Sequence, residues 1–512
     1  MTTRSSIRLW PLLGVAVSLV AGILTGDALY GFMAWSVWLA VLVVAVCCVA
    51  VSFFFCRNGT FRATLVAVAA FAGGAFSVSH SEKAMEVALD GEPEMFEAVV
   101  WDTPRMKPGR VWCNLLVTSG RLAGKHITCG LVSGRADSLH VGDGIRMAAR
   151  VKSIENADGS RFDYRRWCEV HAIVGRAFAV DTCWRRAAVG LSGLSLSERF
   201  ALRLRVLRQR MLLRCGDTLS ESAYAVVAAM TLGDRTALTR ELRDTYSAAG
   251  VSHVLALSGL HLGIVYGFLS FLFMRRRARA LGQTLVIVAI WSYVFMVGMP
   301  SSVVRSATML TVFSFVSLLR RRNVSVNTLS LAAVVLLVAN PLSLWDAGFQ
   351  MSFMAVLGIV IASGRFYGVT HSRFVASHWL VGWVWSMVMV SVSAQIMVLP
   401  LMLHYFGRFP CLFLVSNFVA VPLSTFIVYG GLLLVATLPL PAVNGLVAVA
   451  VERLVEWLNG SLGWIASLPY SSVDNIEFGI VQVVLCYVAI ALAYRLSFYL
   501  ERLVGTQIIK GE

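Results

Sequence analysis

The chain has 512 residues, of which 58% are hydrophobic and 14% are charged, and its formal net charge at pH 7 is +16. This composition excludes an ordinary soluble domain and predicts a polytopic membrane protein. The basic excess fits cytoplasmic loops and anionic lipid, or else the binding of a polyanion, and charge alone does not separate the two. The ten cysteines show no CxxC or zinc-like spacing, so we expect no metal and no cofactor.

Residues 1–80 are predicted to be N-terminal transmembrane helices. The apolar segments fall near 9–24, 34–55 and 64–78. The first follows a basic start without a convincing cleavage site, so we interpret it as a retained span rather than a signal peptide. Arginines flank these segments on one side, at positions 4, 8, 57 and 62. Placing them in the cytoplasm puts the region after the third segment outside the membrane.

Residues 81–182 are predicted to form an external β domain. Turn signals separate short β-rich runs at 96–101, 111–119, 126–132, 145–151 and 171–179. Five short strands in so small a region favour a barrel of the OB type or a compact sandwich. Cys113 and Cys129 lie on consecutive predicted strands, where an external location permits disulfides, and are the favoured pair.

A basic face is expected late in this domain, although an ordinary solvated surface explains the charges equally well. Its cations are Arg146, Arg150, Lys152, Arg161, Arg165 and Arg166. Tyr164 and Trp167, in the run FDYRRW, offer flat rings, although a core role is slightly favoured for Trp167. Single-stranded nucleic acid needs cations along its backbone and rings on which its bases stack. The predicted DNA-binding residues of this domain are Arg146, Arg150, Tyr164, Arg165 and Arg166.

Residues 183–250 are predicted to form basic amphipathic helices. In the run at 195–214, Ser195 and Glu198 make a capping box. One helical face carries Phe200, Leu204, Leu207 and Met211, and another carries Arg199, Arg203, Arg210 and Arg214. Contact with a membrane surface is the favoured interpretation, and guidance of a nucleic-acid backbone by Arg203 and Arg210 is the alternative. A second short helix is expected near 238–249, ending at Gly250.

Residues 251–512 are predicted to form a transmembrane channel domain. Basic clusters at 275–279 and 320–322 bracket a helical hairpin whose turn near 299–302 is therefore placed outside. The segment at 446–468 is assigned to an interfacial helix because it carries Glu452, Arg453 and Glu456. The fold class is thus a polytopic α-helical membrane protein of about ten spans with a small external β-rich, OB-like domain.

Polar residues at membrane depth are the main functional signal. Every backbone N–H and C=O in lipid must find a partner, so polar clusters persist where helices pack closely or line a wet cavity. The predicted pathway residues are His253, Ser258, Gly259, His261, Arg305, Asp346, Gln350, Gln395 and Asn417. For each alone an interhelical hydrogen bond is the simpler role, but their number favours a hydrated interior. Prolines at 300, 400 and 422 would break helices beside this interior.

Two local patterns near the start of this domain have competing interpretations. Gly259, Gly263 and Gly267 would form a small-residue helix crossing. Ser258 and His261 share a helix face, as a nucleophile and its base would, but no orienting carboxylate is identifiable. We therefore expect no catalytic residues.

Several blocks of the sequence occur in a distinctive order. They are GDRTALTRELRDTYSAAGVSHVLALSGLHLG, GMPSSVVRSATM, NPLSLWDAGFQMSFMAVLGI and SAQIMVLPLMLHYFGRFPCLFLVSNFVAVPLS. Together with the upstream FDYRRW element they resemble the ComEC family of competence proteins, which are proposed inner-membrane channels for incoming single-stranded DNA. The resemblance implies an OB-like external domain that meets DNA and a competence domain that forms the pathway. It maps family function onto Asp234, His253, Ser258, His261, Arg305, Asp346 and Gln350.

The chain departs from many family members, which continue into a metallo-β-lactamase-like domain with an H-x-H-x-D-H motif. We therefore expect a non-enzymatic channel for single-stranded DNA during natural transformation. The expected partners are single-stranded DNA, membrane lipids, a DNA receptor, a separate nuclease and a cytoplasmic ATP-driven motor or single-strand-binding protein, since no GxxxxGK[ST] occurs. A secondary transporter for a small or amphipathic solute is the alternative, and a membrane enzyme using Ser258, His261 or Asp346 is a third interpretation.

Overall fold

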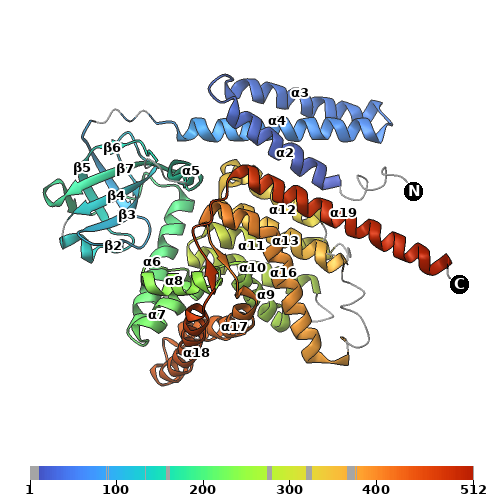
Figure 1. Cartoon of the computed structure of the whole chain (residues 1–512). Helices are drawn as coiled ribbons and strands as arrows, with labels where there is room; N and C mark the ends of the chain where they lie inside the picture. The colour runs from blue at the N-terminus through green and yellow to red at the C-terminus, as the bar shows by residue number, and fades with distance from the viewer. Residues whose placement is uncertain are drawn as a thin grey trace.

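The computed structural model of the chain describes residues 11–87, 89, 92–132, 134–156, 162–273, 279–318, 326–365, 375 and 377–510. A β domain stands beside a larger helical part, at the left in Figure 1. The first three helices lie at the top of that view, with the remaining helices below them. Predictions that concern residues 1–10, Arg161 and the basic clusters at 275–278 and 320–322 fall outside the described residues.

The N-terminal helices match the three predicted spans. They are α2 (Pro11–Ala28), α3 (Trp35–Phe55) and α4 (Gly59–Met85). Glycines hold α2 and α4 together, because a Cβ at Gly22 would lie 1.9 Å from the carbonyl oxygen of Phe71. A Cβ at Gly74 would lie 2.3 Å from the carbonyl oxygen of Leu19. The two backbones thus approach as closely as small residues allow, and α2 packs on α12 (Val326–Ala339) of the larger helical part.

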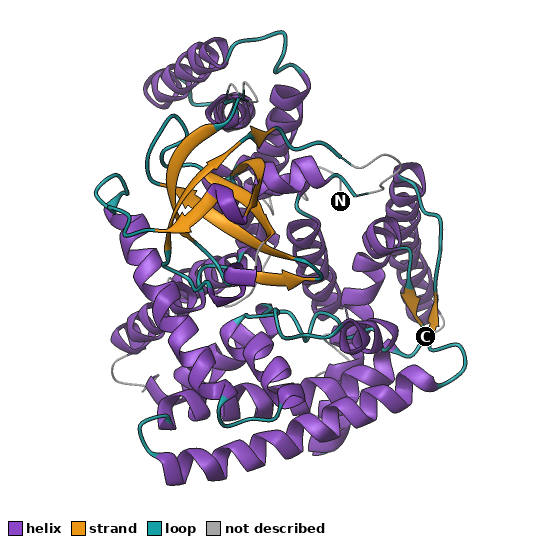
Figure 2. Ribbon diagram, turned by 90° about the vertical axis from the view of Figure 1, so that its left-hand side faces the viewer, coloured by secondary structure: helices purple, strands orange, loops and turns teal. Residues whose placement is uncertain are grey.

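The β domain contains the five predicted strands and three shorter ones. They are β1 (Glu94–Val100), β2 (Arg105–Lys107), β3 (Arg110–Val117), β4 (His126–Val132), β5 (Gly144–Ala149), β6 (Val151–Lys152), β7 (Ile173–Val180) and β8 (Trp184–Arg186). Their order is β6-β7-β4-β3-β1-β5-β8, with β2 beside β3. β4 and β7 run parallel. Since β6 follows β5 directly and pairs with β7, the sheet curls into a half-barrel (Figure 2).

Alternate residues of the strands fill the inside of the half-barrel, as the period of two requires. Cys113 of β3 and Cys129 of β4 lie directly opposite each other in the register. Both are buried, and both are free thiols, contrary to the predicted disulfide. Burial raises the pKa of the Cys113 thiol to about 12, so this thiol is protonated and unreactive at neutral pH.

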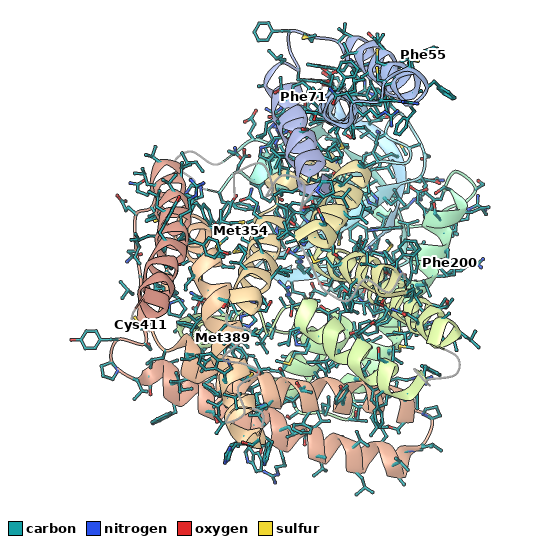
Figure 3. All side chains as sticks on the ribbon, turned by 90° about the vertical axis from the view of Figure 1, so that its right-hand side faces the viewer. Phe55, Phe71, Phe200, Met354, Met389 and Cys411 are labelled. Carbon is teal, nitrogen blue, oxygen red and sulfur yellow. The ribbon has the colours of Figure 1, made fainter. Side chains whose placement is uncertain are left out.

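The segment after the β domain forms the two predicted helices, α6 (Leu196–Gly216) and α8 (Arg240–Ala248). Between them lie α7 (Glu221–Val227) and the π-helical turn η3 (Ala228–Leu232), which the sequence analysis did not predict. Ser195 and Glu198 make the predicted capping box, and Gly250 follows α8 with φ of +79°. The buried face of α6 includes Arg208, so its arginines do not all lie outside. Phe200 of the predicted apolar face is exposed (Figure 3) and is available to lipid.

Further helices make up the rest of the chain. They are α9 (Gly259–Phe273), α10 (Arg279–Val297), α11 (Ser301–Leu318), α12, α13 (Ala347–Arg365), α16 (Trp379–Phe406), α17 (Phe413–Thr437), α18 (Pro441–Ser467) and α19 (Ile480–Lys510). The short turn η5 (Pro341–Trp345) precedes α13, and β9 (Phe409–Pro410) pairs with β10 (Ser472–Val473).

Within the described parts of the chain, eight helices are long and apolar enough to cross a membrane. They are α2, α3, α4, α10, α11, α16, α17 and α19. The helices α9, α12 and α13 are apolar but shorter, so the predicted number of about ten spans stays a prediction. The helix α18, which the sequence assigns to an interface, is outside the eight. A multi-pass membrane architecture follows.

Two of the three predicted helix breaks are wrong. The helix α16 continues through Pro400, and α17 continues through Pro422. Pro300 instead stands just before α11, where the missing N–H and fixed φ of proline are tolerated. The predicted hairpin turn between α10 and α11 is confirmed, with positive φ at Gly298 and Met299.

Candidate functional site

The start of α11 is the centre of the predicted pathway residues. It contacts the start of α9 on one side and the junction of η5 and α13 on another. Predicted residues from three separate segments of the sequence meet along this line: Gly259, Arg305, and the pair Asp346 and Gln350.

Ser258 and His261 cap the start of α9. The backbone N–H of Ser258 donates to Nδ1 of His261 over 3.1 Å, and Oγ of Ser258 lies 3.2 Å from the same nitrogen. Because Ser258 precedes the first residue of α9, His261 occupies the position that Glu or Gln has in a capping box. Since Nδ1 accepts the backbone N–H, the ring proton lies on Nε2, which is buried without a hydrogen-bond partner among the described residues. A nucleophile's base would need a carboxylate there, so the geometry favours capping.

The helices α9 and α11 come closest at Gly259. A Cβ at Gly259 would lie 2.8 Å from the hydroxyl oxygen of Ser306. One turn earlier, Ser302 donates its hydroxyl to the carbonyl of Leu257 over 2.7 Å, which satisfies a carbonyl in the turn before α9. The small-residue crossing is therefore confirmed at Gly259, whereas a Cβ at either of the other two glycines in the row would meet no atom within 4 Å.

Arg305 and Asp346 form a buried ion pair beside this crossing. The guanidinium of Arg305 donates to Oδ2 of Asp346 over 2.7 Å, and Arg305 is 7% exposed. The other carboxylate oxygen of Asp346 accepts the N–H of Gly348 over 3.0 Å, so Asp346 also caps α13. A Cβ at Gly348 would lie 2.8 Å from a guanidinium nitrogen of Arg305. The absence of a side chain at Gly348 therefore lets the guanidinium of Arg305 reach Asp346 at the start of α13.

Gln350 extends the cluster to α16. Its amide nitrogen donates to the carbonyl of Leu344 over 2.9 Å, and its amide oxygen accepts the hydroxyl of Tyr405 over 3.0 Å. Sequence analysis missed Tyr405, although it adjoins His404 in one of the quoted blocks. The available signal was a pair of adjacent polar side chains, His404 and Tyr405, within an apolar run.

The remaining pathway candidates lie apart from this cluster. Asn417 donates to the hydroxyl of Ser391 over 3.2 Å, and its amide oxygen is buried without a partner among the described residues. Gln395 makes a 4.0 Å contact with the sulfur of Met402. His253 is exposed in the turn before α9.

Two further polar residues, Asp234 and His404, form hydrogen bonds that hold turns or chain segments together. Asp234 is 5% exposed and accepts both the N–H and the hydroxyl of Thr236, over 2.9 and 2.7 Å. Nδ1 of His404 lies 2.9 Å from the carbonyl oxygen of Phe478. Asp234, which the family resemblance singles out, thus shapes the turn after η3.

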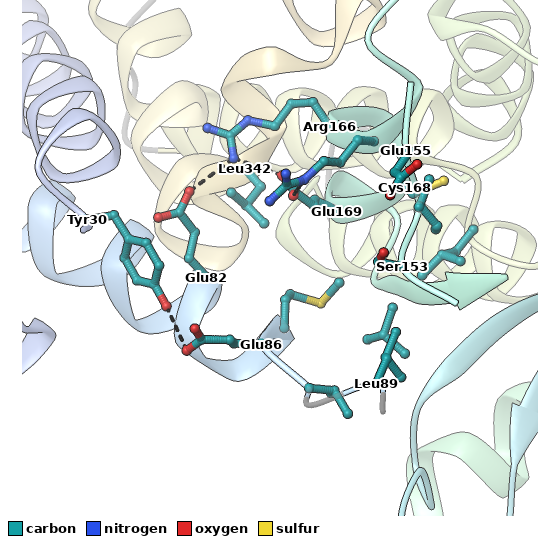
Figure 4. Close-up of a pocket in the computed structure, with 16 residues that line it drawn as sticks. Tyr30, Glu82, Glu86, Leu89, Ser153, Glu155, Arg166, Cys168, Glu169 and Leu342 are labelled. Carbon is teal, nitrogen blue, oxygen red and sulfur yellow. Dashed lines mark hydrogen bonds and ion pairs between the residues drawn. The ribbon is translucent and has the colours of Figure 1, made fainter. Parts of the chain in front are cut away.

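Arg166 is largely buried among ion-pair partners and is not part of an open basic surface. Its side chain, on α5 (Tyr164–Val170), is 18% exposed. The ion-pair partners are Asp27 of α2, Glu82 of α4 and Glu169 of α5, and the guanidinium lies 4.0 Å above the ring of Trp345. Figure 4 shows the Glu82 contact at the edge of a cavity of about 420 Å³. Arg166 therefore links three parts of the chain, which argues against the predicted contact with DNA.

The other predicted DNA-binding residues divide into paired and exposed groups. Arg146 donates Nε to Glu97 over 3.0 Å. Arg165 pairs with Glu169 at 3.1 Å while staying 70% exposed. Tyr164 is half-buried. The exposed cations are Arg150, Arg203 and Arg210. The predicted basic face is thus partly neutralised by its own neighbours.

The rings of Tyr164 and Trp167 stack 5.7 Å apart. Trp167 packs on the buried cluster of Ile154, Cys168 and Ile173, as the favoured core interpretation predicts.

Two arginines of α6 join the β domain to the turn between α10 and α11. Arg205 donates to the carbonyl of Gly298 over 2.7 Å. Arg208 lies 3.2 Å from Oδ1 of Asp102, just after β1, and also donates to the carbonyl of Val297. The β domain and the hairpin turn consequently lie on the same side of the helices, as the charge-based topology requires.

The helical part of the chain is similar to known proteins. A family model described as "Competence protein" matches residues 230–498, which include all of the predicted pathway residues. ComE operon protein 3 of Bacillus subtilis (strain 168) is 30% identical over 279 residues, or 54% of this chain and 34% of that protein. An uncharacterized protein of Aquifex aeolicus (strain VF5) is 31% identical over 137 residues, or 27% of this chain and 32% of that protein.

The chain thus spans about a third of the length of each of these two curated relatives. None of the matching descriptions names an enzyme. No solved structure matches the chain.

Proposed function

The chain belongs to the Competence protein family, and on that premise we propose that it is an inner-membrane channel for the uptake of single-stranded DNA during natural transformation. In this proposal the β domain handles the strand outside the membrane, and the helices that contain the polar cluster form the pathway. The observation that carries the proposal is the set of buried polar atoms without partners inside the helical part.

These atoms are what a hydrated pathway requires. Arg305 Nε, His261 Nε2 and Asn417 Oδ1 are buried and lack hydrogen-bond partners among the described residues. Leaving such atoms unsatisfied costs about 1–3 kcal/mol each. Water or a passing polar ligand removes this cost, whereas a sealed apolar bundle does not. The polar residues therefore support a pathway better than they support a static bundle.

The strand order of the β domain supports the OB-like assignment that we propose for it. Taking β1, β3, β4, β5 and β7 as the five main strands, the third and fifth are parallel neighbours, and β6 continues the fourth to meet the fifth. A five-stranded, partly open Greek-key barrel that binds oligonucleotides is the OB architecture.

The proposed domains are residues 1–80, 81–182, 183–250 and 251–512. The β domain has a buried core of its own. The helices of 183–250 share one core with α9, α10, α11, α17 and α18, so we propose that they work as part of the channel. The proposed partners are a DNA receptor, a separate nuclease and an ATP-driven motor or single-strand-binding protein in the cytoplasm.

The test is transformation with labelled DNA in a deletion strain. The strain is complemented with the native gene, with His261→Ala or with Asp346→Asn, and membrane levels are measured for each. Asp474→Asn is the matched control, because Asp474 also pairs with an arginine, Arg408, but its side chain is 43% exposed. We expect the native gene and the control to restore entry of label into the cytoplasm. The two pathway variants, after entry is divided by the measured membrane level of each, should restore less than a tenth of it.

Two outcomes would overturn the proposal. One is unchanged DNA entry after deletion in competent cells, which would leave a secondary transporter for a small solute as the working hypothesis. The other is full entry with both pathway variants, which would remove the polar cluster from the pathway.

A further inference from the structure

The outer face of the β domain carries aromatic rings in a row across three strands. Trp112 of β3 is opposite Gly130 of β4, and Gly130 is opposite Phe178 of β7. Their neighbours Cys113 and Ala177 point the other way and are buried in the core. The side chains of the row therefore all project from the same outer face.

Gly130 makes room for the two rings. The rings of Trp112 and Phe178 lie 5.4 Å apart at an angle of 76°. A Cβ at Gly130 would lie 3.0 Å from the ring of Phe178 and 3.5 Å from that of Trp112. Phe178 is 48% exposed. Trp112 is half-buried, so Phe178 offers the more exposed ring of the pair to a ligand.

Cations surround the two rings. Lys107 lies 5.8 Å from the centre of the Trp112 ring, and Arg176 lies 5.5 Å from it. Arg110 lies 5.8 Å from the centre of the Phe178 ring. Among the described residues, none of these three cations forms an ion pair. This distinguishes the face from Arg146, Arg165 and Arg166, whose charges are already matched by carboxylates.

We propose that the row of Trp112, Gly130 and Phe178 binds the bases of a single-stranded nucleic acid, whose phosphates contact Lys107, Arg110 and Arg176. Bases have flat faces that stack on aromatic rings, and the backbone needs nearby cations. A duplex hides its base faces inside the stack, and a lipid headgroup has no flat face to present. The inference deepens the proposed function, on which it rests, by assigning the DNA contact to a different face from the one predicted from the sequence.

Further polar and aromatic residues lie between this row and the helices. The next row holds Asn114, Thr128 and Arg176, with a hydrogen bond of 2.9 Å between Thr128 and Asn114. Beyond it the ring of His126 lies 5.0 Å from that of Trp101. Arg205 lies above Trp101 and donates to Gly298, in the turn before α11.

Polar groups and rings thus continue from the stacking row to the helix that carries Arg305.

The experiment measures binding by the purified full-length protein in nanodiscs. The probe is a fluorescein-labelled oligothymidine of about 12 nucleotides, within the range of sites on such domains, and the readout is fluorescence anisotropy. We expect Trp112→Ala and Phe178→Ala each to raise Kd at least about fivefold. Lys107→Gln and Arg110→Gln should each lower the slope of log K against log salt by about 0.7. Unlabelled duplex should compete less well than unlabelled single strand.

Controls separate stacking from general damage. Phe178→Tyr keeps a flat ring and should bind as the native protein does. Phe162→Ala removes a ring of nearly equal exposure, 49%, just before α5, and Arg186→Gln removes a cation paired with Asp143. Both should leave Kd within about twofold, because only ring and phosphate contacts contribute free energy here.

Equal losses for Phe162→Ala and Phe178→Ala would overturn the inference. Affinity that depends on the cations but not on the rings would also overturn it, since phosphate contact alone would then suffice.

Failure of this inference is distinguishable from failure of the proposed function. If deletion abolishes DNA entry but the ring variants bind normally, the channel proposal stands and the face is misassigned. If the ring variants lose binding but deletion leaves DNA entry unchanged, the face binds nucleic acid and the channel proposal is wrong.

Discussion

Arg305 and Asp346 lie 41 positions apart in the chain, and their side chains meet at 2.7 Å, with only 9% and 14% of the two side chains exposed. Asp346 also caps α13, so its charge is balanced by a guanidinium on one side and by the positive end of a helix on the other. This double compensation is what permits both charges to stay inside the helical part.

Asp346→Asn should destabilise the protein by about 3 kcal/mol, because it leaves Arg305 buried without a counter-charge. Thermal unfolding of the purified protein would show a lower midpoint, together with reduced membrane abundance. The double variant Arg305→Met with Asp346→Leu should recover much of the stability, since it removes both charges. It should not recover DNA entry. A double variant that restored both would mean that the pair has only a structural role.

Gly348→Ala should disturb the same pair without changing any charge. The added methyl group would lie 2.8 Å from a nitrogen of Arg305, so the guanidinium must shift away from Asp346. We expect a loss of about 1–3 kcal/mol and reduced uptake.

Gly263→Ala is the matched control, because its Cβ meets nothing within 4 Å. It should be neutral or stabilise α9 by up to about 1 kcal/mol. Equal melting temperatures for the two variants would contradict the proposed steric conflict.

Arg166→Ala should loosen the β domain from the helices. Asp27 and Glu82 would lose the cation they share, and the stacking on Trp345 would be lost as well. Hydrogen exchange should rise by about tenfold or more in α5 and at the end of α4, since two partly buried carboxylates lose their partner. Arg165→Ala, at a side chain 70% exposed, should leave exchange unchanged. Similar exchange in both variants would remove Arg166 from the junction.

His126 should make the β domain more stable at neutral than at acid pH. Burial, with a smaller contribution from the charge of Arg205, lowers the pKa of His126 from 6.5 to about 4. Between these values the unfolded chain binds more protons, so the stability is full above about pH 6.5 and falls as the pH drops towards 4.

We expect a loss of about 3 kcal/mol across this window, seen as a fall in the melting midpoint. His126→Gln should flatten that part of the profile. A native and a variant profile of the same slope would contradict the assignment.

The sequence predicted the elements well because each leaves a local signal. Alternating runs gave the five strands, a Ser and a Glu three residues apart gave the start of α6, and basic clusters gave the α10–α11 hairpin. The helices through Pro400 and Pro422 were mispredicted, because packing against neighbours overrides the local preference of proline in long membrane helices.

The environment of individual side chains was harder to predict. Nothing local to FDYRRW shows that Arg166 meets Asp27, since that pairing depends on how α5 packs against α2 and α4. Trp112 and Phe178 become neighbours only through the parallel pairing of β4 and β7. The sequence shows that Trp112 lies two residues after Arg110, and Phe178 two residues after Arg176, so that each ring shares a strand face with a cation. The sequence does not show the register that places the two rings in one row.

The Arg166 junction also sets an order for biosynthesis. Arg166 is made 139 residues after Asp27, an interval on the order of ten seconds at ordinary rates of translation. During that time the acidic side chains of α2 and α4 have no counter-charge from α5. The first three helices are therefore synthesised before their contacts with α5 exist, and those contacts form only after the β domain that carries Arg166 has folded.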